Sequence, residues 1–365
     1  MTAARNVQRK KRLGGLARAT LDLIARLTPR RPGPSPRRRI GVFLYWGIGD
    51  AVLTLPLLQA LRDAYPDAHI TALGKSWLAD LFGDEALFDS YVELIPPWTR
   101  HRGKYRLWDG NWRRFVELVR HLRRQPFDLL ISQRPDPREV MLARLLGSRE
   151  YAGLAAMGGA GWISVDLGAE LANPGLDYDG AVSAAAAKAL LGVEISPQPR
   201  FRRLERRAAV ERPVLAVSFG ASHPIKRWNE EGIAGALARV TQKPATTLVI
   251  GHDHSPTVRL PAGWERQDWQ GSLPELKALL AGIDVLFCSD SGVMHIAAAA
   301  GCQVVALFTT GSLSRFGPMG HRLYAVEPMP CRPCGDYCIH PTLRCVEGIE
   351  AAAVAMLVDD ALKSV

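Results

Sequence analysis

The stretch "RIGVFLYWGIGDAVLTLPLLQAL", residues 39–61, joins three features in one run. The apolar residues at 39–46 are typical of a buried strand, and 51–64 carry the apolar spacing of a helix. Two glycines and Asp50 lie between them. A strand, a tight turn and a helix in this order predict the first half of a βαβ unit, which belongs to a parallel sheet.

The same alternation continues on both sides of a polar, proline-containing stretch near residue 200. Further strands are expected at 69–74, 90–96, 127–133, 150–154, 214–220, 246–251, 264–271, 284–290 and 302–310. Helices are expected at 75–83, 112–125, 137–147, 173–192, 229–241, 274–281, 292–300 and 348–363. We therefore predict an α/β protein with two Rossmann-like, doubly wound domains facing a central cleft, where open α/β sheets bind ligands.

The 365 residues are enough for two domains of ordinary size. We expect a basic tail with a Pro-rich linker at 1–38 and an N-terminal domain at 39–200. A C-terminal domain is expected at 201–347, followed by a helix at 348–365 that can pack back across the junction.

The net charge of +10 comes from the tail, because residues 1–39 hold 12 Lys or Arg and one acid. The rest of the chain is close to neutral, so its composition does not indicate a nucleic-acid partner. Apolar residues recur at helical spacing in the tail, at Leu16, Ala19, Leu23, Ile24 and Leu27. Two interpretations stay open: a basic amphipathic helix that binds an anionic membrane surface, or a solvated basic arm.

The loop after the first strand predicts a ligand-facing site. Gly47 and Gly49 allow a tight turn and close approach by a ligand. Asp50 follows at or near a helix N-terminus, where it can cap the helix and also remain an ionised carboxylate that accepts a proton. Val52 takes the place of the third glycine of a dinucleotide fingerprint, which argues against a dinucleotide site.

Two loops of the second half have the composition of an anion site. Gly220 and Ser222 follow a strand, and Lys226 comes four residues later, where a cation can hold a phosphate. A lone lysine is otherwise solvated surface.

The segment "CSDSGVMHIAAAAG", residues 288–301, places a hydroxyl-rich turn before a helix of small residues. Ser291, Gly292 and free N–H groups at that helix start suit a diphosphate. Asp290 is expected to cap the helix or to orient the loop, and His295 to be either a ligand contact or a satisfied core histidine.

Three segments together resemble the ADP-heptose:lipopolysaccharide heptosyltransferases, glycosyltransferase family 9. They are "GDAVLTLPLLQALRDAYPDAHITALG", "KRWNEEGIAGAL" and "SDSGVMHIAAAAGCQVVALFTTGSLSRFGP", in the family's order. The resemblance covers roughly residues 39–350. It implies a GT-B architecture with an acceptor domain followed by a nucleotide-sugar domain, and inverting transfer of a heptose that requires no metal or other cofactor.

The resemblance also implies roles for single residues. Asp50 matches the family's catalytic base, Lys226 its phosphate-contacting lysine, and Ser291, Gly292 and His295 its diphosphate loop. It implies ADP-heptose as donor and a lipid-linked glycan as acceptor, at the cytoplasmic face of the membrane. The chain departs from the family at Asn229, which replaces a proline, and at 251–256, "GHDHSP", which lacks the particular acidic residue often seen there for the ribose.

Two other functions remain as alternatives. A nucleotide-sugar 2-epimerase has a similar fold and serine–glycine loop, but it needs more acid and base residues than the matched motifs contain. A non-catalytic membrane scaffold would use the basic tail, although the intact motifs argue against it.

A cysteine cluster lies near the C-terminus, with Cys331, Cys334, Cys338 and Cys345 in fifteen residues. A structural zinc or iron–sulfur site, reduced thiols and disulfides are the three interpretations, and His340 can serve as a substitute ligand. Cys288 and Cys302 are expected in the core.

Overall fold

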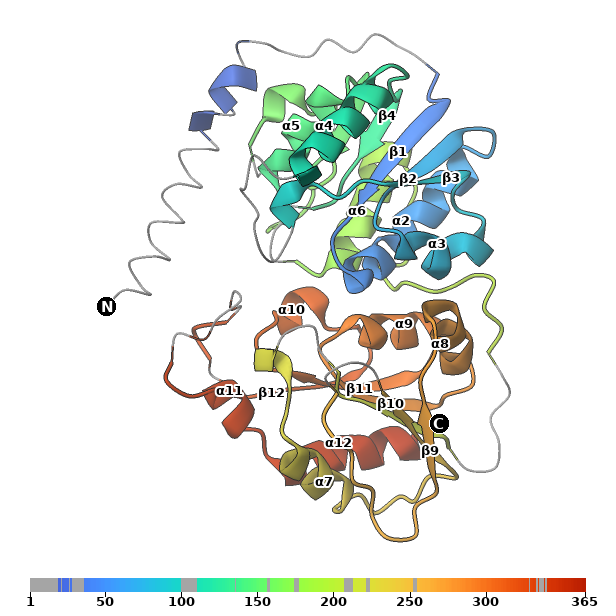
Figure 1. Cartoon of the computed structure of the whole chain (residues 1–365), viewed down its shortest axis with the longest axis vertical. Coiled ribbons are helices and arrows are strands. Elements are labelled where there is room, and N and C mark those ends of the chain that lie inside the picture. The colour runs from blue at the N-terminus through green and yellow to red at the C-terminus, as the bar shows by residue number, and fades with distance from the viewer. Residues whose placement is uncertain are drawn as a thin grey trace. The chain divides into compact units, whose positions relative to one another are not determined.

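The computed structural model describes residues 19–20, 22–25, 27, 36–99, 110–134, 136–155, 158–173, 177–206, 213–220, 224–251, 255–327, 329–332, 334, 338 and 340–365. The chain divides into two compact units, Met1–Pro197 and Gln198–Val365. Each unit holds a six-stranded parallel sheet with helices on its faces (Figure 1). The predicted α/β class with two Rossmann-like domains is therefore confirmed.

The sheet of the first unit has the order β3-β2-β1-β4-β5-β6. Its strands are β1 (Arg39–Leu44), β2 (His69–Gly74), β3 (Ser90–Glu93), β4 (Leu129–Ile131), β5 (Glu150–Gly153) and β6 (Val165–Asp166). Its helices are α2 (Ile48–Ala64), α3 (Trp77–Phe82), α4 (Gly110–Arg123), α5 (Pro137–Leu145) and α6 (Asp179–Leu191). The strand order reverses between β1 and β4, and ligands of doubly wound sheets bind outside the carboxyl ends of such a strand pair.

The second unit repeats this topology with the order β12-β11-β10-β7-β8-β9. Its strands are β7 (Leu215–Ser218), β8 (Thr247–Ile250), β9 (Arg266–Trp269), β10 (Val285–Ser289), β11 (Gln303–Phe308) and β12 (Arg322–Ala325). Its helices are α7 (Glu230–Leu237), α8 (Leu273–Leu280), α9 (Gly292–Ala300), α10 (Leu313–Phe316), α11 (Arg344–Glu347) and α12 (Ala351–Lys363). Here the order reverses between β7 and β10, so this pair marks the second crevice.

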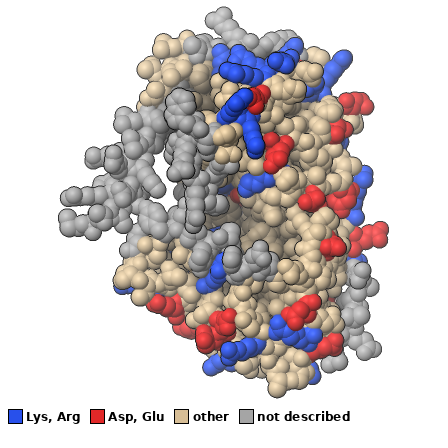
Figure 2. All heavy atoms as spheres, in the orientation of Figure 1, with Lys and Arg blue, Asp and Glu red and all other residues tan. Residues whose placement is uncertain are grey.

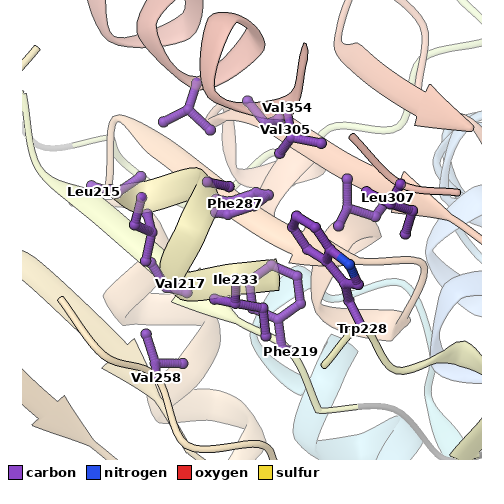
Figure 3. Packing of buried hydrophobic residues seen from close by; sticks show 14 of the residues in the cluster. Leu215, Val217, Phe219, Trp228, Ile233, Val258, Phe287, Val305, Leu307 and Val354 are labelled. Carbon is purple, nitrogen blue, oxygen red and sulfur yellow. The ribbon is translucent and has the colours of Figure 1, made fainter. Parts of the chain in front are cut away.

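The central strands are apolar on both faces because helices cover both sides of each sheet. In the second unit, β7 and β10 contribute Val217, Phe287 and their neighbours to one buried cluster (Figure 3). The C-terminal helix α12 packs against α7 and β11 of the same unit, with Val354 fully buried. The sheets are thus rigid platforms for the loops at their carboxyl ends.

Two strands were not predicted from the sequence. Both β6 and β12 are short edge strands, of 2 and 4 residues, and all their residues are only half-buried. Such strands have no apolar run to mark them, because an edge strand packs less of its surface than a central strand. Helix α6 also begins at Asp179 rather than at the expected residue 173.

Most of the basic tail lies outside the described residues. The part that is described, at 19–20, 22–25 and 27, is helical. Over the described chain, no helix combines the length and the apolar character that crossing a membrane requires. The face shown in Figure 2 carries basic and acidic side chains intermixed over most of its described surface, which agrees with the near-neutral charge beyond the tail.

Candidate active site

Asp50 lies at the carboxyl end of the first central strand. The chain leaves β1, Gly47 adopts an extended conformation, and α2 begins at Ile48. The Asp50 side chain accepts a hydrogen bond from the Gly47 N–H at 2.8 Å and is 22% exposed. Its carboxylate therefore sits at the positive end of a 17-residue helix, beside solvent and next to the β1–β4 reversal.

Arg134 brings a guanidinium to this carboxylate from the neighbouring strand β4. Its Nη1 donates to Asp50 Oδ1 and, at 3.1 Å, to Asp179 Oδ2 in the first turn of α6. Burial alone would lower the pKa of the Arg134 side chain, but the charges of Asp50 and Asp179 raise it above its usual value. The guanidinium is thus firmly cationic. Arg134 was not predicted as a site residue, although it follows the end of a predicted strand.

A second carboxyl group, Glu139, lies fully buried beneath this ion pair. Its Oε1 accepts from the Trp46 indole N–H at 2.6 Å, and its Oε2 accepts from the Ser132 hydroxyl. Burial raises the pKa of Glu139 from its ordinary 4.5 to about 7. The Arg134 guanidinium lies 5.2 Å from the Trp46 ring, so Glu139 is linked to the ion pair through that ring. Glu139 was also not predicted as a site residue, because a single glutamate in the helical segment 137–147 gives no sign of its burial.

Buried hydrogen bonds hold the first turns of α2 in place. Gln133 Nε2 donates to Thr54 Oγ1 at 2.9 Å, and Thr54 Oγ1 donates to the Asp50 carbonyl at 2.8 Å. Ser183 of α6 donates to the Gln133 side chain at 2.9 Å. The β4 loop, α2 and α6 are therefore fixed to each other around the Asp50 carboxylate.

Lys75 is a second cation near this carboxylate. It follows the end of β2 directly, next to β1 in the sheet. Its side chain is partly buried, and burial lowers the pKa of Lys75 while the Asp50 charge opposes that shift. The carboxyl edge of the first sheet therefore presents one partly exposed carboxylate between two cations.

In the second unit, Lys226 and Asp290 meet at the corresponding strand pair. Lys226 follows β7, Asp290 follows β10, and their Nζ and Oδ2 atoms form an ion pair at 2.9 Å. Trp228, two residues beyond Lys226, is only 4% exposed and anchors this loop in the core (Figure 3). The Lys226 side chain remains 30% exposed, so its charge is open to an anion.

The turn at 290–292 leads into α9. Ser291 is the N-cap of α9, so Asp290 does not have the first of its two expected roles, capping the helix. Its carboxylate pairs with Lys226, which agrees with the second expected role, orienting the loop. The Ser291 hydroxyl oxygen is buried and has no hydrogen-bond partner among the residues that the structure describes. Gly292 begins the helix, and His295 is 5% exposed in its first turns.

The loops after β11 and β7 lie close to the Lys226–Asp290 ion pair. A Cβ atom on Gly311, after β11, would collide with the Asp290 carboxylate, so the backbone approach requires glycine. Thr309 Oγ1 donates to the Ile225 carbonyl at 3.4 Å, which links the loops after β11 and β7. Gly220 accepts a hydrogen bond from Ser289 at 3.5 Å, whereas Ser222 lies outside the described residues.

An open hollow of about 680 Å³ lies beside Arg227. Arg227, the N-terminal residues of α7 and Ser255–Pro256 line it, together with part of α11. Asn229 caps α7 by accepting from the Gly232 N–H at 2.7 Å and lies in its wall. Asn229 and the described residues Ser255 and Pro256, which belong to the two departures from the family motifs, therefore border the same hollow.

Comparison with known proteins identifies the family of this chain. Residues 115–339, more than half of the chain, match the family described as glycosyltransferase family 9 (heptosyltransferase). The chain belongs to glycosyltransferase family 9. Lipopolysaccharide heptosyltransferase 2 of Escherichia coli K12 is 25% identical to it over 128 residues, which are 32% of this chain and 37% of that enzyme.

Solved structures share the fold of this family 9 chain. E. coli ADP-heptose lps heptosyltransferase II superposes with a TM-score of 0.61 at 16% identity, over 89% of this chain and 99% of that one. The iron-containing dodecameric glycosyltransferase TibC of enterotoxigenic E. coli superposes with a TM-score of 0.52 at 14% identity, over 90% and 77%.

The family 9 chain therefore carries its predicted site residues in two groups, one at each strand reversal. Gly47, Gly49 and Asp50 lie together in the first unit. In the second unit, Gly220 and Lys226 follow β7, and Asp290, Ser291, Gly292 and His295 follow β10. That the two groups face one cleft stays a prediction.

The cysteine segment lies against the loop after β11. Cys334 N donates to the Thr310 carbonyl at 3.0 Å, and Arg332 Nη1 to the Phe308 carbonyl at 3.0 Å. All six cysteines of the chain are among the described residues and are free, and Cys288 and Cys302 are buried in the core as expected. The other four, with His340, line one small pocket whose free volume is only about 10 Å³.

Proposed function

We propose that this chain is an inverting heptosyltransferase that moves a heptose from ADP-heptose to a lipopolysaccharide core or related glycan acceptor. The observation that carries the proposal is the partly exposed Asp50 carboxylate at the β1–β4 reversal. Inverting transfer needs one base that removes the proton of the acceptor hydroxyl, and a positioned base contributes about 10²- to 10⁴-fold in rate. The position of Asp50 at this strand reversal supports the proposed role of base.

In the proposed reaction, the acceptor oxygen attacks the anomeric carbon of the heptose from the face opposite the diphosphate. The carbon–oxygen bond to the β-phosphate breaks, and its electron pair leaves with ADP. The hydroxyl proton passes to Asp50. One glycosidic bond forms, one sugar–phosphate bond breaks, and the configuration at the anomeric carbon inverts.

The departing ADP needs stabilisation of its negative charge. Lys226 is 30% exposed and held by Asp290, and the N-terminus of α9 lies beside it in the same crevice. The Ser291 hydroxyl, which has no partner in the described chain, is available to donate to a phosphate oxygen. We therefore propose diphosphate binding by these groups without a metal requirement.

The experiment combines ADP-heptose with a heptose-deficient lipopolysaccharide and purified protein. We expect an increase in acceptor mass by one heptose, inverted configuration by proton NMR of the product, and undiminished transfer in EDTA. ADP-heptose alone should yield no epimer. Retention of configuration, an epimer, or the absence of any transfer would refute the proposal.

The nucleotide and sugar of the donor can be tested separately by calorimetry with ADP- and UDP-sugars. We propose ADP-heptose, consistent with the name of the E. coli enzyme that shares the fold. The hollow beside Arg227 is the region to examine, because Asn229, Ser255 and Pro256 border it. Tighter binding of UDP-sugars than of ADP-heptose would refute this donor assignment.

We also propose that the tail binds the anionic inner face of the cytoplasmic membrane. Ala25 is fully buried in the core of the first unit, and Asp22 accepts from the Gly159 N–H at 2.6 Å. The tail helix is thus docked, while Leu23, Ile24 and Leu27 remain 58%, 44% and 73% exposed. Twelve basic residues in 1–39 complement an anionic surface.

Liposome co-sedimentation tests this arrangement. Replacing the three exposed apolar residues by serine should reduce binding to phosphatidylglycerol vesicles, whereas Met356→Ser, at a 72% exposed apolar position of α12, should not. Equal binding of the triple variant and the unchanged protein would contradict the proposal.

For the cysteine cluster we propose a structural zinc or iron–sulfur site with no part in the reaction. Four thiols line one cavity, and thiolates are favoured ligands of both metals. In the described residues no three His, Cys, Asp or Glu side chains are grouped to hold a metal, so the thiolates would have to converge. Elemental analysis should find stoichiometric zinc or iron that Cys334→Ser removes, and metal-free active protein would refute the site.

A further inference from the structure

One guanidinium serves two carboxylates in the first unit. Arg134 Nη1 is shared between Asp50 and Asp179, and the three side chains are 19%, 22% and 8% exposed. Each carboxylate comes from the first turn of a different helix, α2 or α6. Two negative charges around one positive charge leave this group at −1 before any reaction.

Several contacts fix the guanidinium between them. Its Cζ lies 5.2 Å from the Trp46 ring, and the Trp46 N–H is held by Glu139 at 2.6 Å. The Arg134 backbone N–H donates to Ser132 Oγ at 3.1 Å, and that hydroxyl donates to the same Glu139 carboxylate. Glu139 therefore holds both Trp46, which contacts the Arg134 guanidinium, and Ser132, which accepts from the Arg134 backbone. The guanidinium consequently has little freedom to leave Asp50.

A cation in this place has two opposite effects on a base. It orients the carboxylate, but it also stabilises the ionised form and so makes proton uptake harder. A second carboxylate on the same cation counteracts the second effect, because like charges favour protonation of one partner. When Asp50 takes up the proton of the acceptor hydroxyl, Arg134 and Asp179 remain as a neutral pair.

We propose that Arg134 is the positioning residue of Asp50 and that Asp179 balances its charge so that Asp50 remains able to accept a proton. The proposal rests on the function proposed for Asp50. Other titratable side chains face the group from Lys75 after β2, and from Asp136 and Glu139 after β4. They are unchanged in the variants below, so differences between variants report on Arg134 and Asp179.

The proposal predicts opposite effects for two substitutions. In Arg134→Met the carboxylate of Asp50 loses its cation and should take up a proton at a pH higher by about 1 to 3 units. In Asp179→Asn the Arg134 guanidinium acts on Asp50 alone, so Asp50 should take up a proton only at a lower pH. The double variant removes both charges, so its Asp50 midpoint should lie between those of the two single variants.

Carboxyl-carbon NMR of aspartate-labelled protein measures this directly and needs no substrate. The resonance that disappears in Asp50→Asn identifies Asp50, and its titration midpoint is then compared among the variants. Arg37→Met is the matched control, because it removes a similar arginine–carboxylate pair at 2.7 Å near the amino end of β1 and should leave the midpoint unchanged. The double variant leaves no unpaired buried charge, so it keeps the test available if a single variant does not fold.

If the Asp50 titration midpoint shifts in the same direction in both single variants, or shifts in neither, the positioning proposal is overturned. The transfer assay separates this result from the proposed function. If Asp50→Asn transfers heptose at the normal rate, the base assignment fails. If that variant is inactive while the midpoints do not move, the base stands and the roles of Arg134 and Asp179 fail.

Discussion

The buried carboxyl group of Glu139 predicts that the first unit loses stability as the pH rises. Its pKa in the folded chain is about 7, against 4.5 for an unperturbed glutamate, and burial is the main cause. The native state therefore favours the protonated form. The contribution to stability is complete below pH 4.5 and is lost as the pH rises through 7.

The size of the effect follows from that shift. One pKa unit corresponds to about 1.4 kcal/mol, so the whole shift amounts to roughly 3 kcal/mol. Between pH 5 and pH 8 about 2 to 3 kcal/mol of this should be lost, because the unfolded glutamate is already partly ionised at pH 5. Glu139→Gln removes the titration and retains groups that can pair with Trp46 and Ser132.

Urea unfolding followed by tryptophan fluorescence at the two pH values provides the assay. The free energy of unfolding of Glu139→Gln, relative to the unchanged protein, should increase by about 2 to 3 kcal/mol from pH 5 to pH 8. Glu117→Gln on the exposed face of α4 is the control and should show no such change, since its side chain is 56% exposed. A difference that is independent of pH would refute the inference that Glu139 is protonated in the native state.

Further predictions concern the second unit. Lys226→Ala should weaken ADP binding at least tenfold in calorimetry, because an exposed cation of the crevice is lost, and unchanged affinity would contradict its phosphate role. Ser291→Ala should weaken ADP binding while leaving the thermal midpoint of unfolding unchanged, because its hydroxyl has no partner in the described chain. Gly311→Ala should push the Asp290 carboxylate aside and reduce donor affinity; normal affinity with normal folding would show that the ion pair is not needed for binding.

Much of the architecture was predictable because central strands and their helices have strong apolar patterns. The run at 39–61 indicated a strand, a turn and a helix, and β1 and α2 have that order. Strands β6 and β12 were not predicted, because short, half-buried edge strands have no apolar pattern of their own. Apolar patterns in a single sequence indicate which segments are buried, and the edge strands β6 and β12 are only partly buried.

The site was predictable only where local sequence carries the chemistry. Asp50 and Ser291 stand next to glycine turns at strand ends, and such turns are visible in sequence. Arg134 and Asp179 are 84 and 129 residues beyond Asp50, and only the parallel pairing of β1 with β4 and the packing of α6 on α2 bring them together. The local sequence does not indicate that Glu139 is buried, because its burial results from tertiary packing.

The rate of heptose transfer by Asp50→Asn tests the central claim most directly. At saturating ADP-heptose and acceptor, the variant should transfer at least about 10²-fold more slowly than the unchanged protein, with the affinity for ADP-heptose preserved. Transfer at the normal rate would contradict the claim that this carboxylate removes the acceptor proton.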